Sequence, residues 1–250
     1  MKNFKKILLT MAMTMALGTS AFAASGFEFL FQVDGGINWG IPTTETKNLE
    51  MKGYLGADVG IDAQIGYMFQ VKDRFGISAL AELGYSWDWY SFVSTLGDVS
   101  QTRADGTGVT FREGWEMVTT YHSFKLGLLP KFNIGVGNGA IAIGIGGGVK
   151  IPVAGNLRFG YRGWDENLQE EIKLEETNLK RQDISDFFSP SVIGYMKVTF
   201  DYYLFFTDNI GMNFGFYLGG DFAPKVKDLK IGGNAFDFGL QLGFRFGPKA

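Results

Sequence analysis

The sequence is poor in cysteine, in histidine and in long apolar segments, and each shortage excludes a class of protein. It contains no cysteine, so the chain can form neither a disulfide framework nor a lipid-modified N-terminal cysteine. With a single histidine besides, it lacks the ligands of a zinc site. No segment beyond the N-terminal region reaches roughly 18 consecutive apolar residues, which excludes helices that span a membrane.

The N-terminus has the features of a secretory signal peptide. Lys2, Lys5 and Lys6 precede the apolar run 7–17, and the small-residue pattern at 21–23 follows. That run is about half the roughly 20 residues of a membrane-spanning helix, so we expect cleavage near residue 24. This predicts a signal peptide at 1–24 and one mature domain at 25–250. Loss of these lysines changes the formal net charge from −3 to −6, which argues against a nucleic-acid partner.

Glycine and aromatic residues are abundant, with 36 glycines and 16% aromatics, and they follow a regular alternation. From Phe27 to Trp39 the odd positions are apolar or glycine, whereas the even positions are mostly polar or small. A period of two predicts a β-strand with one apolar and one polar face. The same pattern recurs in 53–69, 75–89, 118–134, 141–153, 192–206, 210–222 and 236–246. The sequence therefore predicts eight strands.

Short and long connections alternate between these strands. Short turns fall at 72–74, 135–139 and 207–209, and longer segments fall at 41–52, 91–117, 155–189 and 223–234. The apolar alternation also continues past Val153 through Leu157, Phe159 and Tyr161, which predicts that the fifth strand extends beyond the membrane with these residues on its outer face. The fold class predicted is all-β: an eight-stranded antiparallel up-and-down transmembrane β-barrel, with short periplasmic turns and long extracellular loops.

A soluble lipocalin-like barrel is the alternative with the same strand count. The strands here run 11 to 17 residues, whereas strands of soluble proteins usually have about 5 or 6. A soluble barrel would also place its apolar residues inside. In the transmembrane arrangement, Trp39, Trp87 and Trp89 form an aromatic girdle at the outer ends of the strands, and Phe69 with Phe75 forms the inner one.

The parity of each strand assigns a set of charged residues to the barrel lumen. These are Glu28, Asp34, Asp58, Asp62, Glu82, Asp88, Asp201, Asp221 and Asp237, against Lys125, Lys131, Lys150, Lys197 and Arg245. Eight strands enclose a space that side chains can fill, so a paired and hydrated plug is one interpretation. The other is a narrow path, supported by inward glycines such as Gly144 and Gly146 and by inward aromatics at Tyr54, Tyr203 and Tyr217. Inward glycine also relieves crowding in a curved barrel.

Taken together, these features resemble the small eight-stranded outer-membrane barrels of diderm bacteria, of the OmpA, OmpX and OmpW type. The resemblance covers the mature chain and is architectural. The last strand resembles the signal read by the barrel-assembly machinery, through Asp237, Gly239, Leu242 and Phe244, although the chain continues for four residues beyond Phe246. The resemblance implies an outer-membrane location among lipids, with porin-like topology, extracellular loops and both termini in the periplasm.

Some barrels of this size trim lipid A with a His-x-Ser pair that faces the lipid. His122 faces lipid by parity, but the residue two positions later is Phe124, and Ser123 points into the lumen. The pair is therefore absent, and we expect no enzyme activity, no cofactor and no metal.

The longer connections are where barrel proteins usually carry their function. Exposed aromatic and arginine side chains are common in interfaces, so Phe111, Arg112, Trp115, Arg162 and Trp164 are candidate contacts for an external protein or glycan. Leu168, Ile172 and Leu179 share a helical face, which suggests a short surface helix within 167–182. The function predicted is structural or adhesive, through these loops. The alternative is a narrow pore or a transporter of small or hydrophobic solutes.

Overall fold

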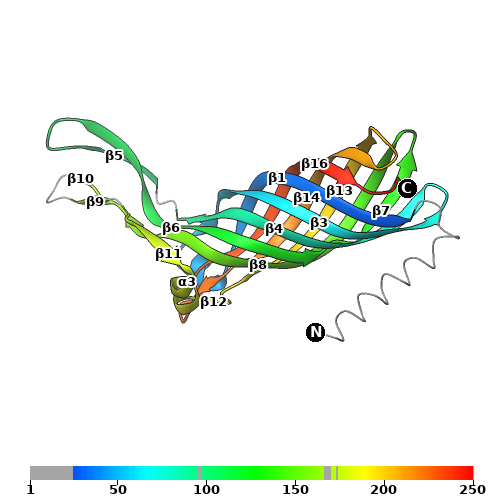
Figure 1. Ribbon diagram of the computed structural model, residues 1–250. Coiled ribbons are helices and arrows are strands. Elements are labelled where there is room, and N and C mark those ends of the chain that lie inside the picture. The colour runs from blue at the N-terminus through cyan, green and yellow to red at the C-terminus, as the bar shows by residue number, and fades with distance from the viewer. Residues whose placement is uncertain (1–24, 95–96, 166–169, 173, 250) are drawn as a thin grey trace.

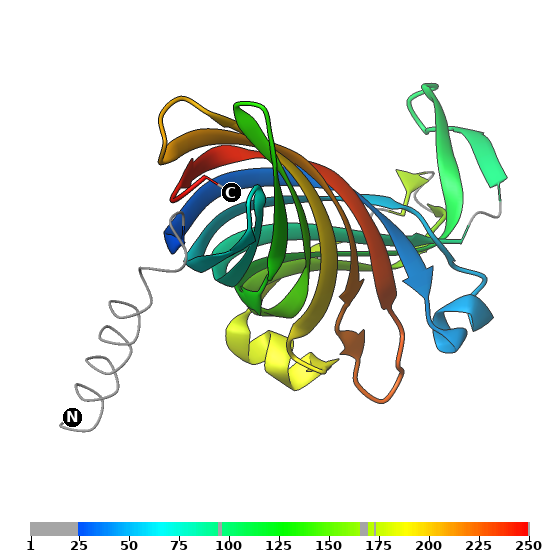
Figure 2. The same ribbon diagram turned by 90° about the vertical axis from the view of Figure 1, so that its right-hand side faces the viewer.

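The computed structural model describes residues 25–94, 97–165, 170–172 and 174–249, which fold mainly into long antiparallel strands (Figures 1 and 2). The predicted signal peptide, 1–24, lies outside the described residues. The barrel wall consists of β1 (Gly26–Pro42), β3 (Leu55–Lys72), β4 (Phe75–Val93), β6 (Gly108–Leu128), β7 (Lys131–Val136), β8 (Gly139–Arg162), β13 (Ile193–Phe205), β14 (Ile210–Phe222) and β16 (Gly233–Phe246).

The wall closes on itself. Each strand pairs with the next one along the chain, and the last strand, β16, pairs with β1 through partners that include Phe29 and Phe246. The contact between β6 and β8 completes the ring, and β7 continues the line of β6 between β4 and β8. With β6 and β7 counted as one strand, the described residues therefore form an eight-stranded antiparallel barrel in up-and-down order, as the alternation predicted. Closure satisfies the backbone groups that an open sheet would leave unpaired at its edges.

The outside of this barrel is apolar and the inside is polar. Ile37, Leu240 and Phe124 are exposed by 54%, 66% and 58%, whereas Asp62 and Arg245 have no exposed surface. A soluble barrel has the reverse arrangement, so this wall is suited to lipid, as expected of a transmembrane barrel. Among the described residues, no helix has the length and apolar character needed to cross a membrane.

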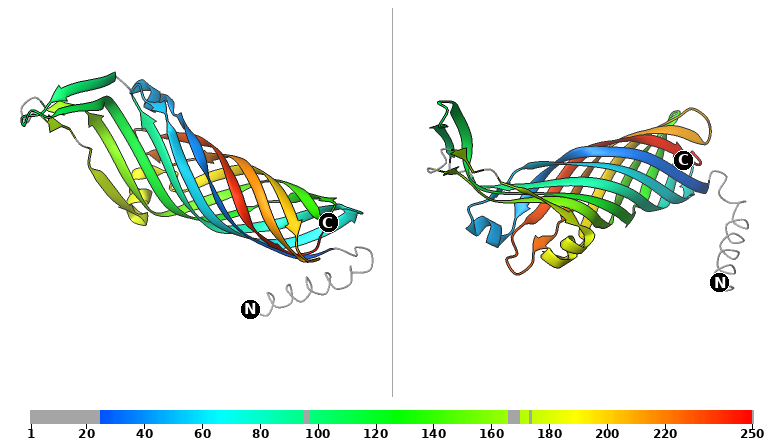
Figure 3. Two further views of the ribbon diagram at one scale, coloured as in Figure 1. Left: turned by 90° about the horizontal axis from the view of Figure 1, so that it is seen from above. Right: turned by 60° about the vertical axis from the view of Figure 1, so that its left-hand side comes forward.

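The two ends of the barrel differ. The turns after β3, β7 and β13 are short and lie at one end, where β1 begins and β16 ends (Figure 3). The longer connections gather at the other end and contain α2 (Thr44–Asn48), α3 (Arg181–Phe187), β2 (Lys52–Gly53), β5 (Gly97–Thr102), β9 (Trp164–Asp165), β10 (Glu170–Glu171), β11 (Glu176–Lys180), β12 (Phe188–Ser189) and β15 (Lys225–Val226). We refer to this end as the loop end.

Two irregularities interrupt the predicted strands, and both contain proline. The predicted strand 118–134 is split between β6 and β7 at Pro130, which has no N–H to give to the ladder. In β8 the register skips one residue, since His122 faces Ala154 and Ser123 faces Pro152. Val153 has no partner in this bulge, which reverses the faces of the strand beyond it. Leu157 consequently packs against an inner apolar cluster. The extension of the strand is confirmed, but its predicted outward face at Leu157 and Phe159 was wrong.

Beyond the barrel, three strands continue as a projecting sheet at the loop end. A hairpin of β5 and β6 extends farthest, next to the end of β8, with β9 and β10 beside it (Figure 1). The segment predicted as a helix within 167–182 is a strand, β11, at 176–180, and the helix α3 begins only at Arg181. Residues 166–169, which include Leu168, lie outside the described residues.

Candidate functional site

The charged residues assigned to the lumen lie on the inner face of the wall. Thirteen of the fourteen are buried, and the side chain of the remaining one, Lys197, is exposed by only 10%. They are arranged in three groups along the barrel axis, each drawn from strands that are distant in sequence. We refer to these groups as the lower, middle and upper networks, with the upper network nearest the loop end.

The lower network lies near the short turns. Arg245 pairs with Glu28, with 2.9 Å between Nε and Oε1, and the Ser78 hydroxyl donates to the other oxygen of Glu28 at 2.5 Å. Lys131 donates to Asp201 at 2.9 Å. The guanidinium of Arg245 also lies 4.4 Å from the centre of the Tyr203 ring, within the range of a cation–π contact.

The middle network contains two ammonium groups between carboxylates. Lys125 donates to Asp62 at 2.6 Å and lies 4.0 Å from Asp34, and Lys197 lies 2.7 Å from Glu82. Two uncharged groups complete it, because Gln64 and Tyr195 both donate to Glu82, at 3.0 and 2.8 Å. Neither of these uncharged partners was identified from the sequence, since parity shows which residues face inward but not which ones meet.

The upper network is centred on Lys150. Its ammonium donates to Asp88 at 2.7 Å and to Asp221 at 2.6 Å. The Tyr90 hydroxyl donates to Asp221 as well, at 2.6 Å, and the Tyr217 hydroxyl donates to Asp58. Asp237 completes the group from β16 and lines the same small cavity as Asp58.

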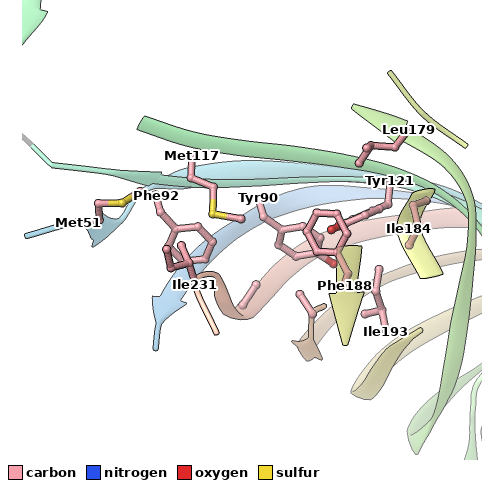
Figure 4. Close-up of a cluster of buried hydrophobic side chains, with 12 residues drawn as sticks. Met51, Tyr90, Phe92, Met117, Tyr121, Leu179, Ile184, Phe188, Ile193 and Ile231 are labelled. Atoms are coloured by element: carbon pink, nitrogen blue, oxygen red, sulfur yellow. The ribbon is translucent and has the colours of Figure 1, made fainter. Parts of the chain in front are cut away.

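An apolar cap lies above the upper network at the loop end (Figure 4). Its buried members are Met51, Tyr90, Phe92, Met117, Tyr121, Leu179, Ile184, Phe188, Ile193, Ala223, Ile231 and Ala235. Six come from the connections between wall strands (Met51, Leu179, Ile184, Phe188, Ala223 and Ile231), and three of these belong to the segment of β11, α3 and β12. No pattern in the sequence indicated this cap, because its residues are scattered over three connections and several wall strands and have no common period.

The barrel is thus closed by paired charges inside and by apolar packing at the loop end. The cavity between the middle and upper networks has a volume of about 30 Å³, enough for one or two water-sized particles. This arrangement matches the interpretation of the lumen as a plug.

The inward glycines do not widen the lumen. A Cβ atom at Gly146 would overlap the carbonyl of Leu128, and one at Gly148 would overlap the carbonyl of Leu126. These positions need glycine because neighbouring strands approach each other closely there. Of the three predicted inward aromatics, Tyr203 and Tyr217 are buried in the lumen, but Tyr54 is 48% exposed at the loop end. Its inward assignment was wrong.

The predicted girdle residues lie on the outer surface of the wall. Trp39, Phe69 and Trp89 are exposed by 53%, 49% and 36%, and Trp87 and Phe75 are half-buried. Their contact with a membrane interface remains a prediction.

Four of the five candidate loop contacts pack against other residues of the projecting sheet. Phe111 is buried and stacks on Trp164 with 6.0 Å between ring centres, and Trp115 stacks on Phe159 at 5.7 Å. Arg162 lies 3.8 Å from Glu116. The side chain of Arg112 lies outside the described set. The expectation that Phe111 is presented to solvent was therefore wrong, because it joins two hairpins instead.

Hydrogen bonds also order the exposed parts of these hairpins. Thr107 N–H donates to Asp105 at 2.8 Å, which holds the pKa of that carboxyl below its ordinary value. The Tyr161 hydroxyl donates to Glu113 at 2.8 Å, which raises the pKa of the phenol.

The only histidine has a partner on the outer wall. His122 Nδ1 and the Tyr85 hydroxyl lie 2.5 Å apart, whereas Ser123 is buried on the lumen side. The two residues therefore do not form a nucleophile and base pair. Among the described residues, no group of three or more His, Cys, Asp or Glu side chains is arranged to hold a metal ion.

The residues of the predicted assembly signal all lie in β16. Asp237 is buried in the lumen, and Gly239 shares its face, whereas Leu242 and Phe244 face outward, with exposures of 50% and 46%. Recognition of this strand by the assembly machinery remains a prediction.

No family model matches the chain, and no curated protein sequence matches it. Several solved structures are similar at low identity. Neisserial surface protein A is 9% identical, with 89% of this chain and 99% of that chain covered and a TM-score of 0.38. The outer membrane protease OmpT from Escherichia coli is 8% identical, with coverages of 92% and 99% and a TM-score of 0.41. Ail, the attachment invasion locus protein of Yersinia pestis, is 8% identical in its complex with a heparin analogue, with coverages of 88% and 99% and a TM-score of 0.35.

Proposed function

We propose that this protein is an integral outer-membrane barrel that acts as a closed membrane anchor and presents its projecting sheet to an external protein or glycan. In this proposal the loop end is extracellular and both termini of the mature chain are periplasmic. The lipid contacts the apolar wall, and the barrel-assembly machinery inserts the chain through β16. The protein has no enzyme activity and needs no cofactor.

Closure of the lumen at two levels is the observation that carries this proposal. The paired charges of the three networks fill the interior, and the apolar cap covers the loop end. A cavity of about 30 Å³ has no room for a solute larger than water or a small ion. This supports an anchor over the alternative of a pore or a transporter.

The projecting sheet is the part of the molecule that such an anchor would display. β8 has 24 residues, or about 80 Å of strand, which spans roughly twice the thickness of a bilayer core when the strand is tilted. The stacks of Phe111 on Trp164 and of Trp115 on Phe159 hold neighbouring hairpins together. A preordered surface loses less conformational entropy on binding than a flexible loop does.

The first test measures conductance of the refolded mature protein in a planar lipid bilayer, with folding confirmed by heat-modifiable gel mobility. We expect no discrete conductance steps. Reproducible steps from folded protein would overturn the closed anchor and favour the pore.

The second test measures retention of proteoliposomes on arrays of glycans and extracellular-matrix proteins. A variant that lacks residues 99–111 can keep the pairing of Gly97 with Glu113 across a two-residue turn of Asp98 and Arg112, and so shortens the hairpin without opening the barrel. We expect retention of the wild type and loss in this variant, with Leu229→Ala in another connection as the control. Equal retention of all three proteins would contradict a role of the projecting sheet.

A further inference from the structure

The outer face of β6 changes from apolar to polar along the strand. Near the short turns its outward residues are apolar and exposed: Phe124, Leu126 and Leu128. Nearer the loop end, Thr120 and Glu116 occupy outward positions of the same strand, and His122 lies between the two parts. Trp87 and Trp89 of β4 pair with His122 and Thr120 at this boundary. Tryptophan is enriched at membrane interfaces, so the polar part of this face begins at the predicted girdle.

Two hollows adjoin on this polar part of the face. Their volumes are about 330 and 280 Å³, and Trp89, Val118 and Arg158 line both of them. We refer to the two hollows together as the interface groove. Clefts of this size can hold a small molecule or a headgroup. The groove adjoins the apolar wall, because Trp87 lines its smaller hollow and belongs to the predicted girdle.

An ion pair holds an arginine side chain in the groove. The Nε and Nη2 atoms of Arg158 lie 2.8 and 2.5 Å from Glu116 Oε1, and 35% of the Arg158 side chain remains exposed. Arg162 lies 3.8 Å from the other oxygen of the same carboxylate. A guanidinium carries five N–H donors, and the two on Nη1 of Arg158 have no acceptor among the described residues. Arg158 is therefore fixed in place with donors left for a ligand.

The lining of the groove is neutral in sum and mixed in chemistry. Arg158 and Arg162 contribute two positive charges, and Glu116 and Glu176 contribute two negative ones. A neutral lining does not favour a simple anion such as free phosphate. Sugar hydroxyls both donate and accept hydrogen bonds, so guanidinium, carboxylate and the amide of Asn156 can all bind them. The two tryptophans of the groove add flat apolar surfaces that suit the C–H groups of a sugar ring.

We propose that the interface groove binds the saccharide headgroup of a glycolipid in the outer leaflet of the membrane. The saccharide lies between Trp89 and Arg158, and the acyl chains extend along the apolar wall below Trp87. A membrane lipid is the occupant because the groove adjoins the lipid-facing wall, where a headgroup tethered by its acyl chains is held at high local concentration. This inference rests on the proposed function only for the outward orientation of the loop end.

The test measures lipid retention by native mass spectrometry of the refolded mature protein in lauryldimethylamine oxide, a detergent without a sugar. Lipid A, an acylated disaccharide with phosphate groups, is compared with phosphatidylglycerol, which carries a phosphate but no saccharide. We expect the wild type to bind lipid A roughly tenfold more tightly than phosphatidylglycerol, because only the saccharide supplies partners for the polar lining. Arg158→Gln should weaken binding of lipid A by roughly tenfold, since it removes charged hydrogen-bond donors. Arg103→Gln, near the tip of the projecting hairpin, removes the same charge elsewhere and should bind as the wild type does.

A pair of tryptophans tests the aromatic part of the groove without a change of charge. Trp89→Ala removes a ring from the groove, whereas Trp39→Ala removes a ring that lines a different hollow. We expect weaker binding of lipid A in Trp89→Ala alone, with folding confirmed by heat-modifiable mobility in both variants.

Three outcomes would overturn the proposal. The first is equal binding of the two lipids by the wild type, and the second is wild-type binding of lipid A in Arg158→Gln or Trp89→Ala. The third is binding of the soluble disaccharide chitobiose as tightly as lipid A, which would place the ligand outside the membrane. Failure of the closed anchor would appear as conductance steps instead, so the two failures are distinguishable.

Discussion

Arg245 and Glu28 form an ion pair across the seam of the barrel, where the last strand meets the first. The Nε and Oε1 atoms lie 2.9 Å apart, and neither side chain has exposed surface. Because β1 is the first strand of the wall and β16 the last, this contact links the two ends of the folded sequence. Its loss should therefore weaken the closure itself.

Arg245→Met should destabilise the barrel by about 3–5 kcal/mol, because it leaves the carboxylate of Glu28 buried without its partner. The urea midpoint of heat-modifiable mobility measures this loss. The double variant Glu28→Gln with Arg245→Met removes both charges and should recover part of it. Lys72→Met, at an exposed position, is the control and should change the midpoint little. Equal midpoints for Arg245→Met and Lys72→Met would show that the pair does not support closure.

Gly146→Ala should prevent or strongly reduce folding, because the new methyl group would overlap the carbonyl of Leu128 on the neighbouring strand. At Gly35 the nearest atom to a built Cβ is the Asp58 carbonyl at 3.7 Å, so Gly35→Ala should fold normally. The yield of heat-modifiable protein after refolding compares the two. Normal folding of Gly146→Ala would mean that the strands can separate there. The inward glycines would then support an open lumen.

Trp164→Ala should loosen the projecting sheet without affecting the barrel. The stack of Trp164 on Phe111 joins β9 to β6, and aromatic pairs contribute about 0.5–1.5 kcal/mol beyond their buried area. Hydrogen exchange should therefore become faster in 97–113, while the wall strands keep their protection. Leu229→Ala, which removes an exposed side chain from another connection, should leave both regions unchanged. Unchanged exchange in Trp164→Ala would show that the hairpins are ordered by their backbone alone.

The barrel could be predicted from the sequence because alternation is a local property of each strand. Membrane strands repeat one simple rule, apolar outward and polar inward, so the inward placement of Asp62 or Lys125 follows from counting residues. The rule fails where the backbone slips. The extra residue at Val153 reversed the faces of β8; the neighbouring Pro152 indicates a disturbed ladder but not that the register skips a residue.

The contacts inside the barrel and at its loop end could not be predicted in the same way. Parity places Lys150 in the lumen, but only the register of several strands brings it to Asp88 and Asp221. Phe111 looked like an exposed contact because its partner, Trp164, lies 53 residues later in the sequence. Such pairings depend on how separate connections pack together, and a single sequence carries no local signal for that.

Phe188 and Phe187 provide a matched pair for the apolar cap, because they are adjacent in sequence and opposite in environment. Phe188 is 1% exposed and contacts Tyr121 edge to face, whereas Phe187 is 59% exposed. Phe188→Ala should cost roughly 3–4 kcal/mol of local stability, since it leaves a cavity among Tyr121 and its neighbours. The segment 176–190 should then be cleaved by protease much faster in Phe188→Ala than in Phe187→Ala, with the wall strands intact in both. If the lower, middle and upper networks close the lumen independently of the cap, Phe188→Ala should still give no conductance steps. Conductance steps in Phe188→Ala but not in Phe187→Ala would instead show that the cap is the barrier to ions. The segment of β11, α3 and β12 would then be its movable part.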